Sequence, residues 1–308
     1  MYRVSTAFAF QSGASDFMRA QNRLVVANGQ SSSGKRATDL KGFGRQSETL
    51  IAAKTVQARA AAFVEQHKML TGRLDAQSLA LDRVADAAEQ SRQLVLSAVS
   101  SGRAESLVSN LNSMFGQAVD ALNWKHEGRY LFSGAQVSVK PVVIDELAGL
   151  TAAPSTADAF RNDQTRSQSR LNETTSLTTG FLADNVGTEL FEVLKSIQAY
   201  HEGPSGPLSG KLSPDQTVFL EGRLAAFGTA YEKLLDRGAE NGLNQKRVDD
   251  ATEAEARRVT SVGSFIADVS EVDFAEATVR VQQAQLALQA SAAAISSLKA
   301  SSLLNFLS

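Results

Sequence analysis

Apolar residues recur at alternating steps of three and four positions near the start of this chain. Phe10, Phe17 and Leu24 follow this spacing, with the small residues Gly13, Ala20 and Ala27 between and after them. Such a pattern keeps one narrow seam of a helix turned toward a partner helix. We therefore predict an amphipathic helix that ends in the Gly- and Ser-rich segment 29–34.

A much longer helix is expected next, because the same spacing runs from Ala53 to Ala98 without a proline. At about 1.5 Å per residue, residues 47–100 would form a rod on the order of 80 Å long. A break at 100–103 precedes a shorter return helix, which Leu107, Leu111 and Leu122 mark. A rod of this length needs lateral partners to cover its seam.

The C-terminal part repeats this arrangement. Ser213, Pro214 and Asp215 are suited to begin a long helix, which a short hinge at 269–273 separates from the final helix. Beyond Arg280 the final helix carries a single charge, Lys299, so no charged outer face is defined. The candidate assembly residues are the large apolar members of the two terminal seams: Phe10, Phe17, Leu24, Phe274, Val281, Leu288, Ile295, Leu298, Leu303 and Phe306.

Residues 135–186 differ from both ends, since they combine prolines with many Ser, Thr and Asn residues and short β-branched pieces. The expected fold class is mainly α: a long antiparallel coiled-coil helical bundle built from both chain ends, with a small β-hairpin or irregular middle region. We expect the chain to divide into five segments. Residues 1–34 and 269–308 would form the two parts of an inner coiled coil, and residues 35–134 and 187–268 the two parts of a helical bundle. Residues 135–186 would form the middle region.

Composition supports a mainly helical chain. All five prolines lie between Pro141 and Pro214, which leaves both ends free of helix breakers. The 31 basic and 33 acidic residues nearly balance, so neither nucleic acid nor an anionic membrane is an expected partner. There is no cysteine, and the N-terminus lacks the apolar run of a cleavable signal peptide.

Four segments resemble the flagellin superfamily. They are the SSSGKR segment that ends in Gly34, Lys35 and Arg36, the ENGLNQKR segment at 240–247, the Ala-, Gln- and Ser-rich C-terminal helix with its Ser-Leu-Leu ending, and GRYLFSG at 128–134. The last of these, which contains Tyr130, Leu131, Phe132, Ser133 and Gly134, is similar to the hook-associated proteins of the hook-filament junction. Filament flagellin is the alternative within the superfamily, and a non-flagellar coiled-coil adaptor or secreted effector is a more distant one.

The resemblance implies an extracellular structural subunit of the bacterial flagellum. It would be exported unfolded by the flagellar type III apparatus, without a cleavable signal, and held before export by a cytoplasmic chaperone. Its partners would be further copies or neighbouring axial proteins, namely flagellin and hook-associated protein 1.

Enzymatic alternatives have weak support in the sequence. Residues 29–35 match GxxxxGK of a nucleotide-binding loop, but Arg36 replaces the magnesium-binding Ser or Thr and a helix rather than a strand precedes the loop. His67, His126 and His201 do not form a metal-binding spacing. We expect no catalytic residue, cofactor, metal or small-molecule substrate.

Overall fold

The computed structural model describes residues 2–307, and the side chains of residues 8–299. The chain forms two compact units, each built from both halves of the sequence. Unit 1 comprises Met1–Ala60 and Arg257–Ser308, and unit 2 comprises Ala61–Ala256. Helix accounts for 74% of the residues, so the expected mainly α fold class is confirmed.

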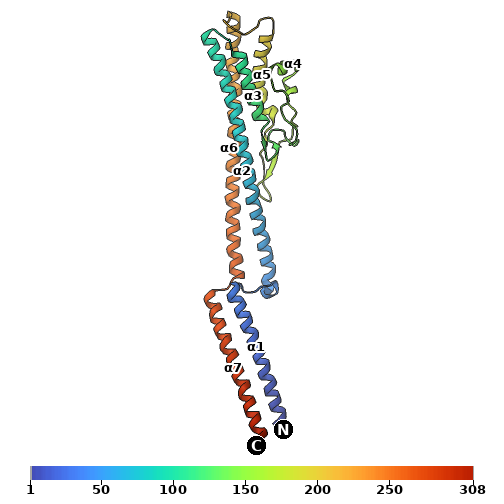
Figure 1. Ribbon diagram of the computed structural model, residues 1–308, viewed down its shortest axis with the longest axis vertical. Helices are drawn as coiled ribbons and strands as arrows, with labels where there is room; N and C mark the ends of the chain where they lie inside the picture. Colours follow the sequence, from blue (N-terminus) through green and yellow to red (C-terminus); the bar gives the residue numbers. More distant parts are fainter. Residues whose placement is uncertain (1, 308) are drawn as a thin grey trace. The chain divides into compact units, whose positions relative to one another are not determined.

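The elements follow one another in this order: α1 (Tyr2–Ser33), the 3-10 helix η1 (Leu40–Gln46), α2 (Ser47–Ser101), α3 (Leu107–Leu122), β1 (Lys125–His126), β2 (Arg129–Tyr130), α4 (Leu147–Ala152), the 3-10 helix η2 (Thr156–Ala159), β3 (Gln168–Arg170), β4 (Ser176–Thr178), α5 (Ala183–Glu202), α6 (Pro214–Ser270) and α7 (Phe274–Leu307). The long α2 and α6 pass through both units (Figure 1).

The two long helices confirm the prediction from spacing. Helix α2 has 55 residues and α6 has 57, so each is a rod of about 80 Å. Ser213 caps α6 as expected: its Oγ accepts the amide of Gln216 at 3.2 Å, and the Gln216 side chain accepts the amide of Ser213 at 3.0 Å. This reciprocal pair satisfies two backbone donors at the start of the helix.

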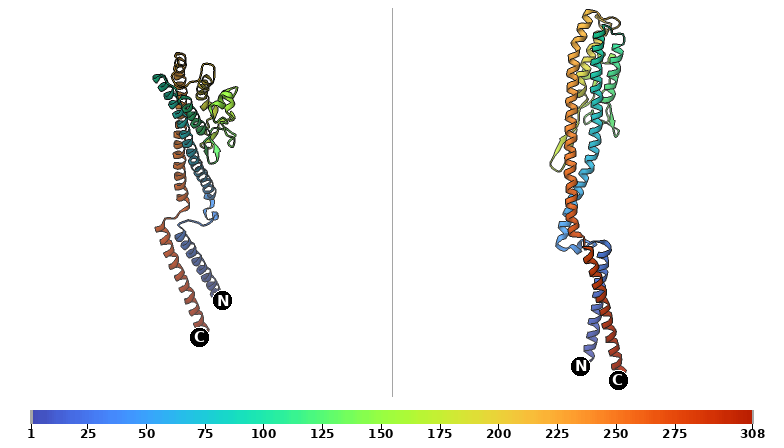
Figure 2. Two further views of the ribbon diagram at one scale, coloured as in Figure 1. Left: turned by 45° about the horizontal axis from the view of Figure 1, so that its top comes forward. Right: turned by 90° about the vertical axis from the view of Figure 1, so that its left-hand side faces the viewer.

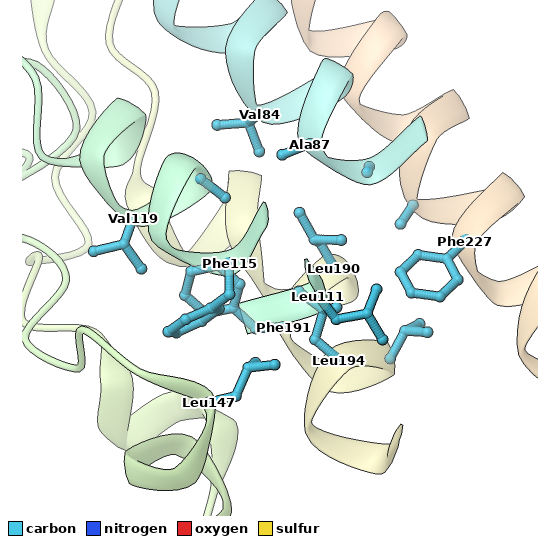
Figure 3. Packing of buried hydrophobic residues seen from close by; sticks show 14 of the residues in the cluster. Val84, Ala87, Leu111, Phe115, Val119, Leu147, Leu190, Phe191, Leu194 and Phe227 are labelled. Carbon is cyan, nitrogen blue, oxygen red and sulfur yellow. The ribbon is translucent and has the colours of Figure 1, made fainter. Parts of the chain in front are cut away.

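Unit 2 has a large apolar core where the return helix α3 and helix α5 pack against the long helices (Figure 3). Phe115 of α3 lies 4.8 Å from Phe191 of α5 between ring centroids, and Phe160 stacks on Phe191 at 5.3 Å. All of these rings are buried, and Phe227 of α6 is also fully enclosed. Unit 2 therefore has the aromatic core of an independently stable domain.

The middle region at 135–186 contains one antiparallel hairpin, β3–β4, whereas the other hairpin, β1–β2, precedes it. The β-branched piece at 137–144 forms no strand, however, and contributes one isolated bridge between Val142 and Phe160. Helix α5 begins at Ala183. In this region burial against α3 and α5 decides the structure, whereas a short run of β-branched residues does not.

In unit 1, α1 and α7 lie side by side in the views of Figures 1 and 2, with both ends of the chain at the same end of the helix pair. The hinge expected at 269–273 is present, since α6 ends at Ser270 and α7 begins at Phe274. Asp273 caps α7 by accepting the amide of Ala275 at 2.7 Å. No helix among the described residues is long and apolar enough to cross a membrane.

Candidate assembly surface of the terminal helices

The register of α1 against α7 is antiparallel. A Cβ at Gly13 would lie 3.4 Å from Ile295 Cγ1. Further along α1, Ala27 lines the same groove as Ala284. Just beyond the end of α1, the backbone of Lys35 forms an isolated antiparallel β-bridge with that of Glu271. Residues with increasing numbers on α1 lie beside residues with decreasing numbers on α7, so the two helices form a two-stranded antiparallel coiled coil.

The residues turned toward the partner helix keep the three-four spacing. On α1 they are Gly13, Phe17, Ala20, Leu24 and Ala27, and on α7 they are Ala277, Val281, Ala284, Leu288, Ser291, Ile295 and Leu298. Only alanines among them are fully buried, from Ala277 at 1% exposure to Ala284 at 7%. Each large apolar member of the seam is half-buried, so the pair stabilises itself weakly in the free chain.

Two expected seam residues are not covered within the chain. Phe274 is 70% exposed and Phe10 is 43% exposed, so the partner helix of the same chain does not cover them, and their part in assembly stays a prediction. At 3.6 residues per turn, each lies about 60° around its helix from the seam centre, which explains the exposure. Leu303 and Phe306 lie outside the residues whose side chains are described.

Further large apolar side chains of the helix pair face outward. Met18 and Val25 on α1 are each 65% exposed, and so is Leu286 on α7. Sequence reasoning missed these residues because it counted only the seam. Their signal was present, since Met18 and Val25 are seven residues apart and therefore share a face. Uncovered apolar side chains gathered on one helix pair mark an interaction surface.

An open groove of about 510 Å³ runs along one side of the helix pair. Its lining residues are Asn22, Arg23, Val26, Ala27 and Gln30 of α1 with Arg280, Gln283, Ala284 and Ala287 of α7. Small alanines form its floor, and amides and guanidinium groups form its rim. The lining offers no nucleophile or general base, so the groove is suited to receiving side chains rather than to chemistry.

The Gly34-Lys35-Arg36 segment links the end of α1 to the junction between α6 and α7. The Arg36 amide donates to the Ser270 carbonyl at 2.8 Å, and the Arg36 Nε donates to the Glu271 carbonyl at 3.0 Å. Gly34 has a φ of +67°, which favours glycine. Lys35 follows the end of a helix instead of preceding a helix N-terminus, as a phosphate loop would require. The segment therefore has a structural role within unit 1.

The segment from Tyr130 to Gly134 belongs to the folded structure of unit 2. Leu131, Phe132 and Ser133 are buried, and the Phe132 carbonyl accepts the amide of Ala183, the first residue of α5, at 2.9 Å. Gly134 has a φ of +72°, and a Cβ there would lie 2.0 Å from the Asp163 carboxylate. These residues position α5 and do not form an exposed binding site.

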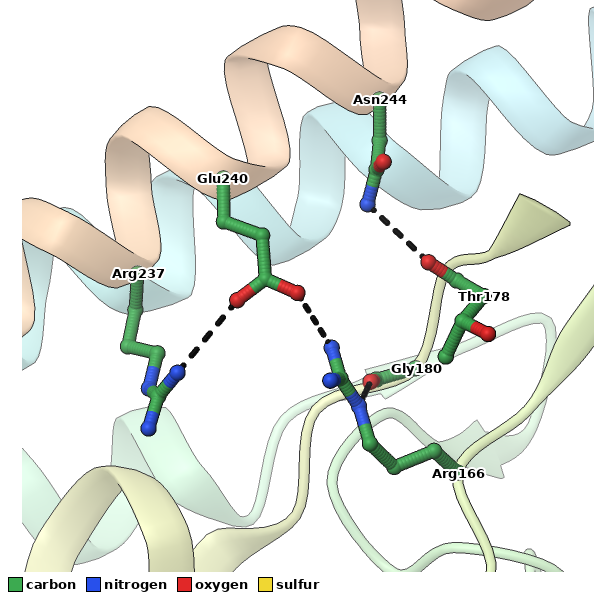
Figure 4. A network of polar contacts seen from close by, with 6 residues as sticks. All are labelled: Arg166, Thr178, Gly180, Arg237, Glu240 and Asn244. Carbon is green, nitrogen blue, oxygen red and sulfur yellow. Dashed lines mark hydrogen bonds and ion pairs between the residues drawn. The ribbon is translucent and has the colours of Figure 1, made fainter.

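The ENGLNQKR segment fixes the β3–β4 hairpin to the long helices (Figure 4). Glu240 pairs with Arg166 at 2.6 Å, while Arg166 Nε donates to the Gly180 carbonyl at 2.7 Å. Asn244 donates to the Thr178 carbonyl at 3.2 Å. Nearby, Asn241 donates to a carbonyl of α2, that of Leu74, at 2.9 Å.

The three histidines have separate local roles. His67 is buried, with its Nε2 2.9 Å from the Leu171 carbonyl, His126 packs near Gly72, and His201 Nδ1 accepts the Leu208 amide at 3.1 Å. Over the described residues, no group of three or more His, Cys, Asp or Glu side chains could hold a metal ion.

Comparisons with known proteins agree with this architecture. Residues 224–307, which include most of α6 and all of α7, match the bacterial flagellin C-terminal helical region. No curated protein sequence gives a significant match.

Two solved structures have the same fold at low sequence identity. A Vibrio parahaemolyticus structure described as a flagellar hook-associated protein is 16% identical, with a TM-score of 0.59, and the match covers 73% of this chain and 97% of that one. Bacillus cereus FlgL is 13% identical, with a TM-score of 0.52 and coverage of 70% and 98%. The match over residues 224–307 and the fold shared with these two structures confirm the resemblance to the flagellin superfamily drawn from the sequence.

Proposed function

We propose that this chain is a structural subunit of the bacterial flagellum that connects hook and filament. The observation that carries the proposal is the helix pair of unit 1, whose buried residues are alanines and whose larger side chains, such as Met18 and Val25, remain exposed. A helix pair of this kind gains its stability from neighbouring subunits. The GRYLFSG segment and the fold shared with FlgL favour the junction over the filament.

In this proposal the terminal segments, 1–34 and 269–308, form an inner coiled coil that polymerises with further copies and with neighbouring axial proteins. Flagellin on the filament side and hook-associated protein 1 on the hook side are the proposed neighbours. The chain would leave the cell through the flagellar type III apparatus as an unfolded polypeptide, after release from an export chaperone. No step requires catalysis by this chain.

Deletion of the gene tests the proposal. Cells without the protein should retain hooks, lose filaments and release filament protein into the medium, because the connection between the two structures is missing. Immunogold labelling of wild-type flagella should place the protein at one point, where hook meets filament.

Other labelling patterns decide for the alternatives. Gold particles along the whole filament would identify a filament flagellin, which the flagellin C-terminal region at 224–307 also supports. Flagella that carry no label, in cells whose motility survives the deletion, would favour a non-flagellar adaptor or effector.

A further inference from the structure

The β1–β2 hairpin of unit 2 turns one face toward helix α2. His126 pairs directly with Arg129 across the hairpin, so their side chains lie on the same face. His126 lies beside α2 at Gly72, where a Cβ would be 3.8 Å from the imidazole Cε1 and 3.9 Å from Nε2. The other pair, Lys125 and Tyr130, belongs to the opposite face, where the Lys125 ammonium lies 4.5 Å from the centre of the Tyr130 ring. His126 and Arg129 therefore share the face that is turned toward α2.

Arg73, the residue of α2 that follows Gly72, brings a second guanidinium group to this face. Burial, and to a smaller extent the charge of Arg129, lowers the pKa of Arg73. The two cations are therefore close enough to repel each other, and Arg73 has lost much of its hydration. Within the described part of the chain, neither guanidinium has a hydrogen bond, an ion pair or a ring contact. Glu127, at the tip of the hairpin, is exposed and forms no ion pair there either.

The other partly buried arginines of unit 2 all have a compensating group. Their charges lie against a carboxylate or an aromatic ring: Arg92 pairs with Glu89, Arg166 and Arg237 pair with Glu240, and Arg223 lies over the ring of Phe219. A charge that is taken out of water is costly unless an opposite charge or a hydrogen bond compensates it. Arg73 thus differs from the rest of its class, and the site lacks negative charge.

We propose that Arg73, His126 and Arg129 bind an oxyanion of the phosphate class between the β1–β2 hairpin and helix α2. A guanidinium group offers planar, forked donors that match the oxygens of a phosphate or a carboxylate. Two uncompensated guanidinium charges favour phosphate over a single carboxylate, because a phosphate group carries up to two negative charges near neutral pH. An imidazole N–H of His126 supplies a third donor.

A bound anion would fasten the hairpin to α2. Arg129 belongs to the GRYLFSG segment, which also holds the start of α5 through the hydrogen bond between the Phe132 carbonyl and the Ala183 amide at 2.9 Å. Because the anion binds only where Arg73 and Arg129 are folded together, it would stabilise unit 2 by linkage. The inference goes beyond the proposed function and does not depend on it.

Titration of the whole chain with inorganic phosphate tests the inference. In calorimetry at constant ionic strength, we expect saturable binding of phosphate at one site and much weaker binding of acetate. Arg129→Gln and Arg73→Gln should each weaken phosphate binding at least about tenfold, because each removes a charged donor. Arg129 is exposed, so its variant should fold even if Arg73→Gln does not. The control is Arg247→Gln, which removes an exposed charge of α6 and should leave phosphate binding unchanged.

Thermal unfolding gives a second readout. Phosphate stabilises many proteins because it is excluded from their surface, so the comparison between variants is the measure. Relative to chloride at the same ionic strength, phosphate should raise the unfolding midpoint of wild type and Arg247→Gln more than that of Arg129→Gln. Absence of saturable binding, or equal phosphate affinity in wild type and Arg129→Gln, would refute the site. Acetate binding as tight as phosphate binding would refute the assignment to the phosphate class.

Discussion

Leu288 offers the most direct test of the terminal helix pair. It lies half-buried on the seam of α7, between the buried Ala284 and the half-buried Ser291. Leu288→Asp removes an apolar side chain from the seam and adds a charge that must either lose water or push the helices apart. Unit 2 has its own core, so we expect the change to affect unit 1 and its assembly only.

The magnitude follows from burial. Full burial of a leucine contributes about 1.5–3 kcal/mol, so a half-buried Leu288 contributes about 1 kcal/mol in the free chain. An unpaired polar group in the seam costs at least a further 1–3 kcal/mol or so. Among the described side chains of the helix pair only alanines are fully buried, so a loss of about 2–4 kcal/mol is large for it. The same penalty would recur in every assembled subunit.

Two assays separate assembly from folding. The main thermal transition of the free variant, followed by circular dichroism, should lie within about 2 °C of wild type because unit 2 is unchanged. In a deletion strain, the variant should restore neither filaments nor swimming, as scored by electron microscopy and motility agar.

Gln282→Asp is the matched control, since Gln282 is exposed and lies off both seam and groove. Gln283 is less suitable, because it lines the groove. Normal swimming of the Leu288→Asp strain would show that the seam of α7 does not hold the protein in the flagellum. A failing control beside a functional Leu288→Asp would show that the inward face of α7 has been assigned wrongly.

Three further predictions concern folding and chemistry. Gly134→Ala should lower the free energy of unfolding of unit 2 by about 2–4 kcal/mol in urea, because Gly134 has a positive φ and an added Cβ would meet the Asp163 carboxylate. The control Gly128→Ala has a φ of +78° and open space around the added Cβ, so it should lower that free energy by about 1–2 kcal/mol. Equal losses in the two variants would contradict the steric argument. In the free chain, amides of residues 275–299 should exchange hydrogen far faster than the core of unit 2, and strong protection would refute the weak pairing. Lys35→Ala should leave calorimetric titrations with ATP unchanged, because neither protein should bind it; micromolar binding lost in the variant would favour a nucleotide site.

The long helices could be predicted from the sequence because their signal is local and repeated. A seam of three-four spacing over more than six heptads, without proline, leaves helix as the simplest structure. The hinge before α7 could also be predicted from the sequence, since Asp273 is a suitable N-cap residue for that helix. By contrast, the segment at 137–144 has β-branched residues but forms no strand, because its environment is set by residues distant in sequence.

Motifs were easier to recognise than their partners. The ENGLNQKR segment stood out, but nothing nearby indicates that Glu240 pairs with Arg166 or that Asn241 reaches the Leu74 carbonyl. Those contacts join positions 74 and 167 residues apart. Spacing also did not show that Phe10 and Phe274 are exposed within the chain, because a periodic pattern identifies residues near a seam but not how far around the helix the partner reaches.

The two units bury apolar surface in different ways, and that difference bears on assembly. Unit 2 encloses whole phenylalanine rings from α3, α5 and α6, so its stability is independent of other chains. Along the described part of α1 and α7 the fully buried apolar residues are four alanines: Ala20, Ala27, Ala277 and Ala284. Each contributes little, because a single methyl group is worth about 0.8 kcal/mol at most. The larger side chains of this pair can therefore contribute fully only when a neighbouring molecule covers them, so folding of the terminal helices and assembly should be thermodynamically coupled.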